Sequence, residues 1–365
     1  MKITKKKISE LNRPYAIAEL TFEGAPCVLV AAEGNDPCLL IDGSGRVIGQ
    51  PWQGPGGVMT MEELPSKDGS FLSTQLFYSP DDASEAKLIL AEPAAAAADS
   101  MGGRPGADGV SWSLRVLAEV PFIHRFGILS RGGVNYLIVC ALKTGCEYDG
   151  DWRFPGTVSA CVLPEDLSEF GPGHHLPLRV IKSGLLKNHG FCKLQRDGFV
   201  SALVTCEEGV FEFVPPAAPE DEWTVARLLD MPVSDARLCD LDGDGLDELC
   251  CISPFHGDTV TIHHLNDNGC YEQIWQFAEP VPFSHAIWAG TLAGTPAFVL
   301  GHREGKRDTM VITWDASAGS YNTSVIDPGA GAANVLHFVN SEGQDVIIGA
   351  NRETDEAAMY IISAD

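Results

Sequence analysis

The sequence predicts an all-β fold, a seven-bladed β-propeller formed by a single domain over residues 1–365. The main observation is a unit that recurs along the chain: an apolar strand, a turn with glycine, and a second strand rich in β-branched and aromatic residues. Most turns follow one another at intervals of roughly 45 to 50 residues, close to the length of a four-stranded propeller blade, and two intervals of roughly 65 residues contain insertions. They contain Gly24, Gly69, Gly133, Gly198, Gly245, Gly294 and Gly343. Seven such turns predict seven blades.

The composition fits this fold. The chain has 38 glycines and 23 prolines among its 365 residues, which suits many short strands joined by turns. Long amphipathic helical patterns are hard to find. A closed ring of blades also accommodates a chain of this length in one domain.

The two ends of the sequence complement each other. The last repeat reads AANVLHFV, QDVIIGA and AAMYIISA, which gives only three strands, whereas residues 1–10 contain a strand-like segment before the first repeat. An N-terminal strand that completes the last blade would close the ring and leave no open sheet edge. We therefore expect residues of about 2–10 to pair with residues of about 357–364. The alternative is a frayed basic tail.

Two insertions interrupt the repeats. Residues 93–111 are rich in Ala, Gly and Pro and are expected to form a surface loop. Residues 143–187 carry Trp152, His174, His175 and several basic residues. A long excursion of this kind often shapes a pocket over one mouth of a propeller.

A calcium-binding loop is predicted in the fifth repeat, at residues 240–248, here called the acidic loop. Side-chain oxygens fall at its positions 1, 3, 5 and 9, with glycine at position 6 and a backbone carbonyl at position 7. Ca²⁺ takes six to eight oxygen ligands in irregular geometry, and glycine allows the sharp turn. The predicted ligands are Asp240, Asp242, Asp244, the Leu246 carbonyl and either Glu248 or Asp247. Only this repeat keeps the full pattern, so one calcium site is expected.

The acidic loop is followed by a strand-like run, Leu249–Ile252, rather than by an EF-hand helix. In this it resembles the calcium loop of FG-GAP (VCBS) repeats, which form blades of β-propellers. The family usually has Asp at the ninth position, where this chain has Glu248 beside Asp247. The resemblance implies an ion that pins a hairpin, and hence a structural role.

The cysteines and the net charge limit the cellular compartment and the classes of binding partner that can be expected. The eleven cysteines show no disulfide framework or zinc spacing, and the sequence shows no signal peptide or apolar membrane span, so a reduced, cytoplasmic protein is expected. The net charge of −25 opposes binding to nucleic acid or to an anionic membrane. The basic residues of the third and fourth repeats could receive an anionic small molecule, or they could simply be solvated. They are Arg125, Arg131, Lys143, Arg153, Arg179, Lys182, Lys187, Lys193 and Arg196. The oligomeric state stays open.

Histidines mark the starts of four repeats: His124, His189, His285 and His337. The first strand of each blade lines the centre of a propeller, so side chains at equivalent positions converge on one axis. Imidazoles gathered there could act as acids, bases or metal ligands, and they could hold a second, catalytic divalent ion. The alternative for each of them is a structural histidine bonded to a neighbouring blade.

Roles follow for the nearby residues. His124 and His189 are the candidate base and acid, in either order, and His285 is a further catalytic candidate. Arg125 could stabilise an oxyanion only if a bulge or the strand end re-aims it, because successive residues of a regular strand face opposite sides and Arg125 would otherwise face away from His124. Side chains that could contact a substrate are Trp152, Asp151, Lys187, His337 and His256. The pair His263–His264 is expected to be structural.

A second resemblance covers about residues 121–192. The segments PFIHRFG, ALKTGCEYDGDWRFPGTV and LLKNHGF resemble the propeller of aldos-2-ulose dehydratases and, more loosely, propeller polysaccharide lyases. This resemblance implies β-elimination on a keto-sugar or uronic sugar, with a divalent ion and histidines at the active site.

The sequence thus predicts a cytoplasmic, carbohydrate-active lyase or dehydratase whose substrate is a small sugar or sugar acid. The first alternative is a calcium-stabilised propeller without activity that holds a protein or glycan partner, because fold alone does not decide function. A sugar-binding sensor without turnover is the second. Imidazoles and cations that converge within hydrogen-bond range favour an enzyme, whereas an exposed apolar face favours a scaffold.

Overall fold

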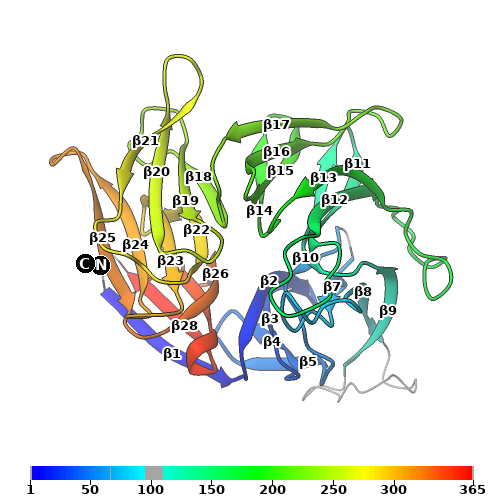
Figure 1. Ribbon diagram of the computed structural model, residues 1–365. Coiled ribbons are helices and arrows are strands. Elements are labelled where there is room, and N and C mark those ends of the chain that lie inside the picture. Colours follow the sequence, from blue (N-terminus) through cyan, green and yellow to red (C-terminus); the bar gives the residue numbers. More distant parts are fainter. Residues whose placement is uncertain (1, 66, 95–109, 364–365) are drawn as a thin grey trace.

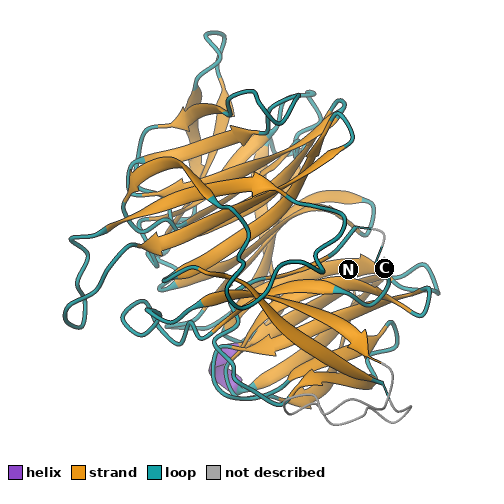
Figure 2. Cartoon of the chain, turned by 90° about the vertical axis from the view of Figure 1, so that its right-hand side faces the viewer, coloured by secondary structure: helices purple, strands orange, loops and turns teal. Residues whose placement is uncertain are grey.

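The computed structural model describes residues 2–65, 67–94 and 110–363. Strands and the loops between them make up this part of the chain, and its only helical element is one turn of 3-10 helix, η1 (Arg352–Thr354) (Figure 2). The predicted all-β class is therefore confirmed.

The strands form antiparallel sheets around a common centre, which makes the fold a β-propeller (Figure 1). Each of the first two sheets has four strands that follow one another in the chain. The first comprises β2 (Pro14–Phe22), β3 (Ala25–Ala32), β4 (Cys38–Asp42) and β5 (Val47–Trp52). The second comprises β6 (Met61–Glu63), β7 (Phe71–Gln75), β8 (Lys87–Ala94) and β9 (Ser111–Glu119).

An eight-stranded sheet follows, and its two halves are joined through the single residue pair Arg131–Phe199. One half comprises β10 (Ile123–Arg131), β11 (Val134–Lys143), β12 (Pro155–Val162) and β13 (Arg179–Leu185). The other comprises β14 (Gly190–Arg196), β15 (Phe199–Cys206), β16 (Gly209–Val214) and β17 (Thr224–Leu229). Each half repeats the order of the four-stranded sheets.

The next two sheets again have four strands each. One comprises β18 (Asp235–Cys239), β19 (Glu248–Ser253), β20 (Thr259–Leu265) and β21 (Tyr271–Gln276). The other comprises β22 (Ser284–Leu292), β23 (Thr295–His302), β24 (Thr309–Asp315) and β25 (Ser320–Asp327).

The last sheet contains both ends of the chain, in the order β1-β28-β27-β26. Its strands are β26 (Ala332–Val339), β27 (Asp345–Asn351), β28 (Glu356–Ser363) and β1 (Lys2–Glu10). The pairing of β1 with β28 runs from Lys2 opposite Ser363 to Glu10 opposite Glu356. The predicted partnership of the N-terminal segment with the last strand is therefore present.

The first strand of each unit lies at the centre (Figure 1). Contacts join β26 to β2, β2 to β6, β10 to β14, β14 to β18, β18 to β22 and β22 to β26. Side chains at the start of these strands therefore lie near one another, although they are distant in the sequence.

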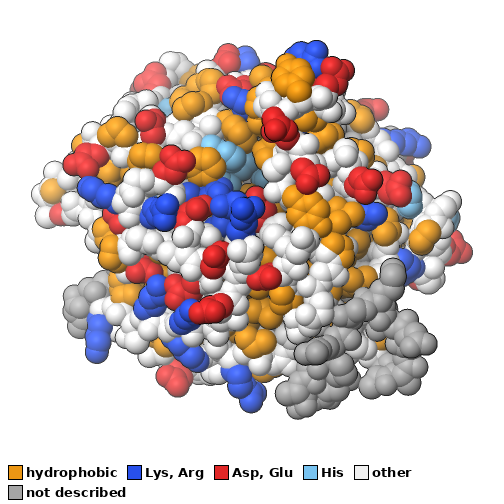
Figure 3. Space-filling view, turned by 60° about the horizontal axis from the view of Figure 1, so that its bottom comes forward, with side chains coloured by type: hydrophobic (Ala, Val, Ile, Leu, Met, Phe, Trp, Pro, Cys, Tyr) orange, Lys and Arg blue, Asp and Glu red, His pale blue; other side chains and the backbone are white. Residues whose placement is uncertain are grey.

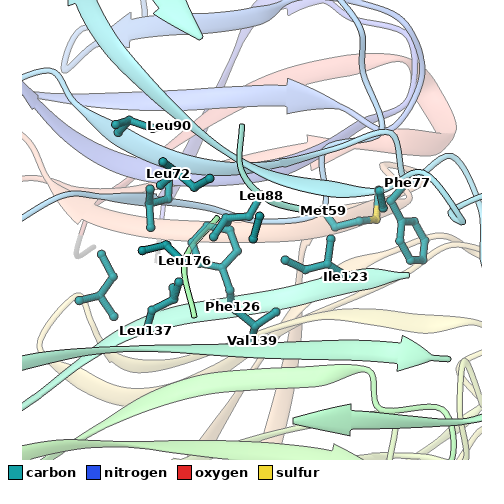
Figure 4. Close-up of a cluster of buried hydrophobic side chains, with 14 of the residues drawn as sticks. Met59, Leu72, Phe77, Leu88, Leu90, Ile123, Phe126, Leu137, Val139 and Leu176 are labelled. Atoms are coloured by element: carbon teal, nitrogen blue, oxygen red, sulfur yellow. The ribbon is translucent and has the colours of Figure 1, made fainter. Parts of the chain in front are cut away.

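The core lies between neighbouring sheets. Figure 4 shows one interface, where Leu72 and Leu88 of the second sheet pack near Phe126 and Leu137 of the next. Burial of a large apolar side chain contributes about 1.5–3 kcal/mol. The faces between the sheets therefore hold the inner strands in place.

The predicted insertion at residues 143–187 is wrong in extent. It includes β12 and β13, two strands of the ordinary sheet, and only residues 144–154, 163–178 and 186–187 lie outside the strands. The run PGTVSACV alternates between more and less buried residues along β12, a strand pattern that the turn-based count overlooked. The insertion predicted at 93–111 falls between β8 and β9, but its residues 95–109 lie outside the described residues.

All eleven cysteines are free thiols. Within the described residues, no helix has the length and apolarity needed to cross a membrane.

Candidate active site at the propeller axis

A repeated backbone feature positions one residue at the start of each inner strand. These equivalent positions hold Tyr15, Met59, His124, His189, Ser234, His285 and Ala333. In six of the seven, the residue two places earlier has a left-handed backbone: Arg13, Gly57, Phe122, Lys187, Phe283 and Gly331, with φ between 52° and 70°. Pro232 precedes Ser234, and proline cannot adopt positive φ. Non-glycine residues in this region cost roughly 1–3 kcal/mol each, so the surrounding structure must hold them there.

β-Bulges re-aim three of these side chains, those of Tyr15, His124 and His285. The registers of β2, β10 and β22 each shift by one residue at Tyr15, His124 and His285. A bulge leaves its extra residue outside the ladder and re-aims the side chain. The bulges therefore explain how three distant sheets present their side chains to one point.

Backbone carbonyls of neighbouring units fix the orientation of three imidazoles. The Nδ1 atom of His124 lies 3.2 Å from the carbonyl oxygen of His189, and that of His189 lies 3.0 Å from the carbonyl of Ser234. The Nδ1 atom of His285 lies 2.6 Å from the carbonyl of Ala333. A carbonyl only accepts, so each Nδ1 carries the proton and each neutral ring has its lone pair on Nε2.

The free ring nitrogens converge. The Tyr15 hydroxyl lies 2.9 Å from Nε2 of His285 and 3.3 Å from Nε2 of His124. Nε2 of His256 lies 3.2 Å from Nε2 of His189. We call these five side chains the axial site. The hydroxyl has one proton to donate and two imidazole acceptors, so Tyr15 can donate its hydrogen bond to either His285 or His124.

The axial histidines are held neutral. Burial is the main reason why the pKa of His124, His189 and His285 lies well below its usual value, because desolvation disfavours the imidazolium. Burial, followed by the charge of Arg303, lowers the pKa of His256 to about 3. Burial raises the pKa of Tyr15. At neutral pH the site therefore presents unprotonated imidazoles beside a protonated phenol.

Arg125 belongs to this site because of the bulge in β10. Its guanidinium donates a hydrogen bond from Nη1 to the Met59 carbonyl at 2.7 Å, and its Cζ lies 5.5 Å from the centre of the Tyr15 ring. The condition set for Arg125 by the sequence is thus met: a register shift lies between Ile123 and Arg125.

Trp152 and Lys187 lie one aromatic layer away from the histidines. The Trp152 ring packs edge-on against Phe255 at 5.2 Å, and Phe255 packs against His189 at 5.2 Å. The Lys187 ammonium lies 5.4 Å from the Phe255 ring and pairs with Glu207 at 2.7 Å. On the face shown in Figure 3, histidine side chains are visible next to hydrophobic side chains and a group of cations and carboxylates.

The structure separates Asp151 and His337 from the axial site. The Asp151 carboxylate accepts hydrogen bonds from Arg153 and from the Glu147 backbone, and the bond to Arg153 is the main cause of its lowered pKa. It therefore secures its own loop. His337 pairs with Asp345 at 2.6 Å and packs against Trp288. It lies four residues beyond Ala333, roughly 13 Å along a strand, near the far end of β26 rather than at its start.

Sequence reasoning missed Tyr15 and Arg303. Tyr15 occupies the same position in the first repeat as the histidines do in later ones, and its place directly after Pro14 at the start of a strand was a usable signal. Arg303 comes directly after β23, and its guanidinium stacks on Phe283 at 4.3 Å. Nothing in the sequence around Arg303 marks it.

Two groups of side chains could hold metal ions. The ligand atoms of His189, His256 and His285 lie within 4.8 Å of one another. Two of these rings are fixed by Nδ1–H bonds to carbonyls, as is usual for histidine ligands. The close approach of the His189 and His256 ring nitrogens also requires a proton or a cation between them. The group therefore fits a divalent ion.

The other group is the acidic loop between β18 and β19. Carboxylate oxygens of Asp240, Asp242 and Asp244 lie within 4.8 Å of one another. Glu248 belongs to a further such group with Asp242 and His264, and its buried carboxylate accepts bonds from the Leu241 backbone at 2.7 Å and the Tyr321 hydroxyl at 3.0 Å. This placement favours Glu248 over Asp247 as the fourth acidic side chain.

No protein-family model matches the chain, and no curated protein matches it. A solved structure of streptogramin B lyase is similar, with a TM-score of 0.52 and 12% sequence identity. The similarity covers 99% of this chain and 98% of that chain. At this identity it supports the β-propeller fold and nothing beyond it.

Proposed function

We propose that the protein is a lyase that breaks a carbon–oxygen bond by β-elimination at the axial site. The observation that carries the proposal is the Tyr15 hydroxyl between two imidazoles whose free Nε2 atoms face it. The lyase name of the similar structure agrees with this reaction class. The substrate we propose, from the sequence resemblance, is a keto-sugar or a uronic sugar.

The side chains supply each part of an elimination. A neutral imidazole, His124 or His189, takes the proton α to a carbonyl or carboxylate. The electron pair of the C–H bond forms the C=C bond, and the pair of the C–O bond leaves with the oxygen. That oxygen takes a proton from the Tyr15 hydroxyl. The imidazolium formed by the base can then return a proton to Tyr15. Arg125 stabilises the enolate in surroundings that exclude water.

Metal ions have separate proposed roles. We propose that the acidic loop binds Ca²⁺ and pins the hairpin between β18 and β19, as its resemblance to FG-GAP repeats implies. We also propose that His189, His256 and His285 would hold a divalent ion, which would add Lewis-acid stabilisation of the enolate when bound. With the ion bound, His124 would be the base, because the one lone pair of the His189 imidazole would be on the ion.

We further infer that the propeller has seven blades in a closed ring. The eight-stranded sheet supports the count, because its halves share one residue pair and each repeats the four-strand order. The pairing of β1 with β28 and the contact of β26 with β2 support closure.

The test is an ultraviolet assay for unsaturated products, with keto-sugars and uronic-acid glycosides as substrates. Acid and base groups each contribute about 10²–10⁴-fold, so His124→Ala and His189→Ala are each expected to lower turnover at least about a hundredfold. His337→Ala is the matched control and should keep near-normal turnover, since its imidazole binds Asp345 away from the axis. Equal turnover in the wild type and both axial variants would overturn the mechanism.

One observation favours a non-enzymatic propeller instead. His124, His189 and His285 are only 3%, 1% and 2% exposed, as expected for side chains that hold neighbouring blades together. If no member of the sugar panel is turned over, and if the His→Ala variants lose stability rather than activity, a scaffold for a protein or glycan partner becomes the better description.

A further inference from the structure

Arg125 is a buried cation without a counter-ion. Two cationic residues are buried in the described part of the chain, Lys143 and Arg125, at 0% and 8% exposure. The Lys143 ammonium pairs with the Asp81 carboxylate at 2.7 Å. Among the described residues no carboxylate lies within salt-bridge distance of Arg125, whose one hydrogen bond goes to the Met59 carbonyl. A buried charge left unpaired costs several kcal/mol.

The surroundings of Arg125 do not offset this cost. Its Cζ lies 5.5 Å from the centre of the Tyr15 ring, and the preceding residue is His124; neither side chain offers a negative charge. The nearby Arg303 has a carboxylate partner, since it bonds to Glu353 through Nε at 2.8 Å. Arg125 is therefore left with an uncompensated positive charge, within a protein whose net charge is −25.

A carboxylate would resolve this imbalance. The guanidinium has five N–H donors in a planar fork that matches a carboxylate, and Arg125 uses one nitrogen on Met59. Inorganic cations would be repelled by the same charge unless imidazoles bound them directly. Neutral sugars would leave the guanidinium charge uncompensated.

We propose that the axial site binds a carboxylate-bearing small molecule whose carboxylate pairs with the Arg125 guanidinium. The inference rests on the proposed function, since it names the substrate class of the same site: a sugar acid rather than a neutral keto-sugar. Binding can nevertheless be measured without turnover, so the two proposals can fail separately.

The experiment measures thermal unfolding in sodium glucuronate, with sodium chloride of equal ionic strength and glucose as the comparison conditions. A ligand that binds only the folded state raises the melting temperature by mass action. Glucuronate should raise the Tm of the wild type above that in sodium chloride, whereas glucose should not. In Arg125→Met the shift should vanish. The ligand-free Arg125→Met protein should melt no lower than the wild type, because the substitution removes an uncompensated buried charge.

Arg131→Met is the matched control. Arg131 lies on the same strand β10, donates to a carbonyl, that of Pro215, at 2.8 Å and stacks on Phe199 at 5.0 Å, but it is half-buried. This variant should keep the full shift with glucuronate. Arg125→Lys, which keeps the charge and loses the fork, should weaken glucuronate binding about tenfold or more, and it serves if Arg125→Met does not fold.

Three outcomes would overturn the inference: no effect of glucuronate beyond that of sodium chloride, an equal effect of glucose, or an undiminished shift in Arg125→Met. A large drop in the Tm of ligand-free Arg125→Met would also count against it, since it would show a structural role. Turnover of neutral keto-sugars without any glucuronate shift would leave the lyase proposal standing and remove this one. A glucuronate shift that depends on Arg125, without turnover of any substrate, would do the reverse.

Discussion

The acidic loop gathers its carboxylates within one turn of nine residues, 240–248, whereas the axial site gathers side chains from positions as distant as Tyr15 and His285. The acidic loop is exposed at Asp244, and its aspartates bond to the loop's own backbone, as Asp240 does to Gly243 and Gly245. Four of the five axial side chains are buried, His256 is half-buried, and they bond across sheet boundaries. The two regions therefore differ in what holds them and in what they reveal about function.

This contrast separates two kinds of information. A turn that folds around a cation is encoded by the spacing of neighbouring residues, so it can be recognised locally, but the same turn occurs in propellers of any activity. The axial site depends on bulges, left-handed residues and contacts between strands that are distant in the sequence. The axial site therefore says more about the chemistry of the protein than the acidic loop does, but it is harder to recognise in the sequence.

The largest expected effect that separates the two regions is a loss of stability on acidification. The lowered pKa values of the axial histidines mean that the unfolded chain binds more protons than the folded one at pH below about 6.5. Their contribution is therefore complete above that pH and is lost as the pH falls, toward about 3 for His256. Each histidine can remove up to about 1.4 kcal/mol per pH unit.

The measurement is urea unfolding of chelator-treated protein between pH 7.5 and 5. The dependence of the unfolding free energy on pH should become shallower, by about one proton, in His285→Gln, which removes one titrating ring. A stability that stays constant over this range would show that the axial imidazoles are solvated or already charged in the folded protein.

The sequence was sufficient wherever the signal was local. The glycine turns, the strand alternation and the acidic loop all depend on residues close in the chain, and the structure contains each of them. The pairing of β1 with β28 was also predictable, because the last repeat was one strand short. In these cases the short-range pattern, or the number of strands in a repeat, leaves few alternative structures for the segment.

The sequence was insufficient wherever geometry depends on a register shift. His337 was grouped with the axial histidines although it is the sixth residue of the strand predicted as AANVLHFV, and each position along a strand moves a side chain by about 3.3 Å. Asp151 was placed at the site, although a carboxylate two residues from Arg153 has a local partner. Tyr15 was overlooked because the search was for histidines, while the bulge at this position accepts any side chain.

The next largest effect distinguishes the two regions through a pair of tyrosines, one in each, and is a change of about a hundredfold in turnover. Tyr15 donates to axial imidazoles, and Tyr321 donates to Glu248 of the acidic loop. Tyr15→Phe should lower lyase turnover by about 10²-fold or more, because it removes the proton donor while keeping the ring. Tyr321→Phe should leave turnover nearly unchanged.

The readout for this pair is kcat measured alongside the melting temperature in calcium. For Tyr321→Phe, a lower Tm with unchanged kcat is expected, because a buried Glu248 oxygen loses its donor, at a cost of about 1–3 kcal/mol. If Tyr15→Phe keeps full activity, the proton on the axial phenol takes no part in the reaction, and the acid must be an imidazole.

The smallest expected effect is that of calcium, which should act on stability alone. An ion that binds only the folded state contributes about 2.7 kcal/mol when its concentration is a hundred times the Kd. Chelation should therefore lower the Tm of the wild type, and Asp242→Ala should lower it in calcium to a similar extent.

The matched control is Asp267→Ala. Asp267 is an exposed aspartate in the turn between β20 and β21 of the same sheet, so this variant should retain the calcium response. Because the acidic loop and the axial site share no side chain, Asp242→Ala should keep its turnover at temperatures well below its Tm. A melting temperature that does not respond to chelation would remove the proposed ion from the acidic loop, whereas a loss of turnover without a loss of stability would show that the two regions are coupled through β18 and β19.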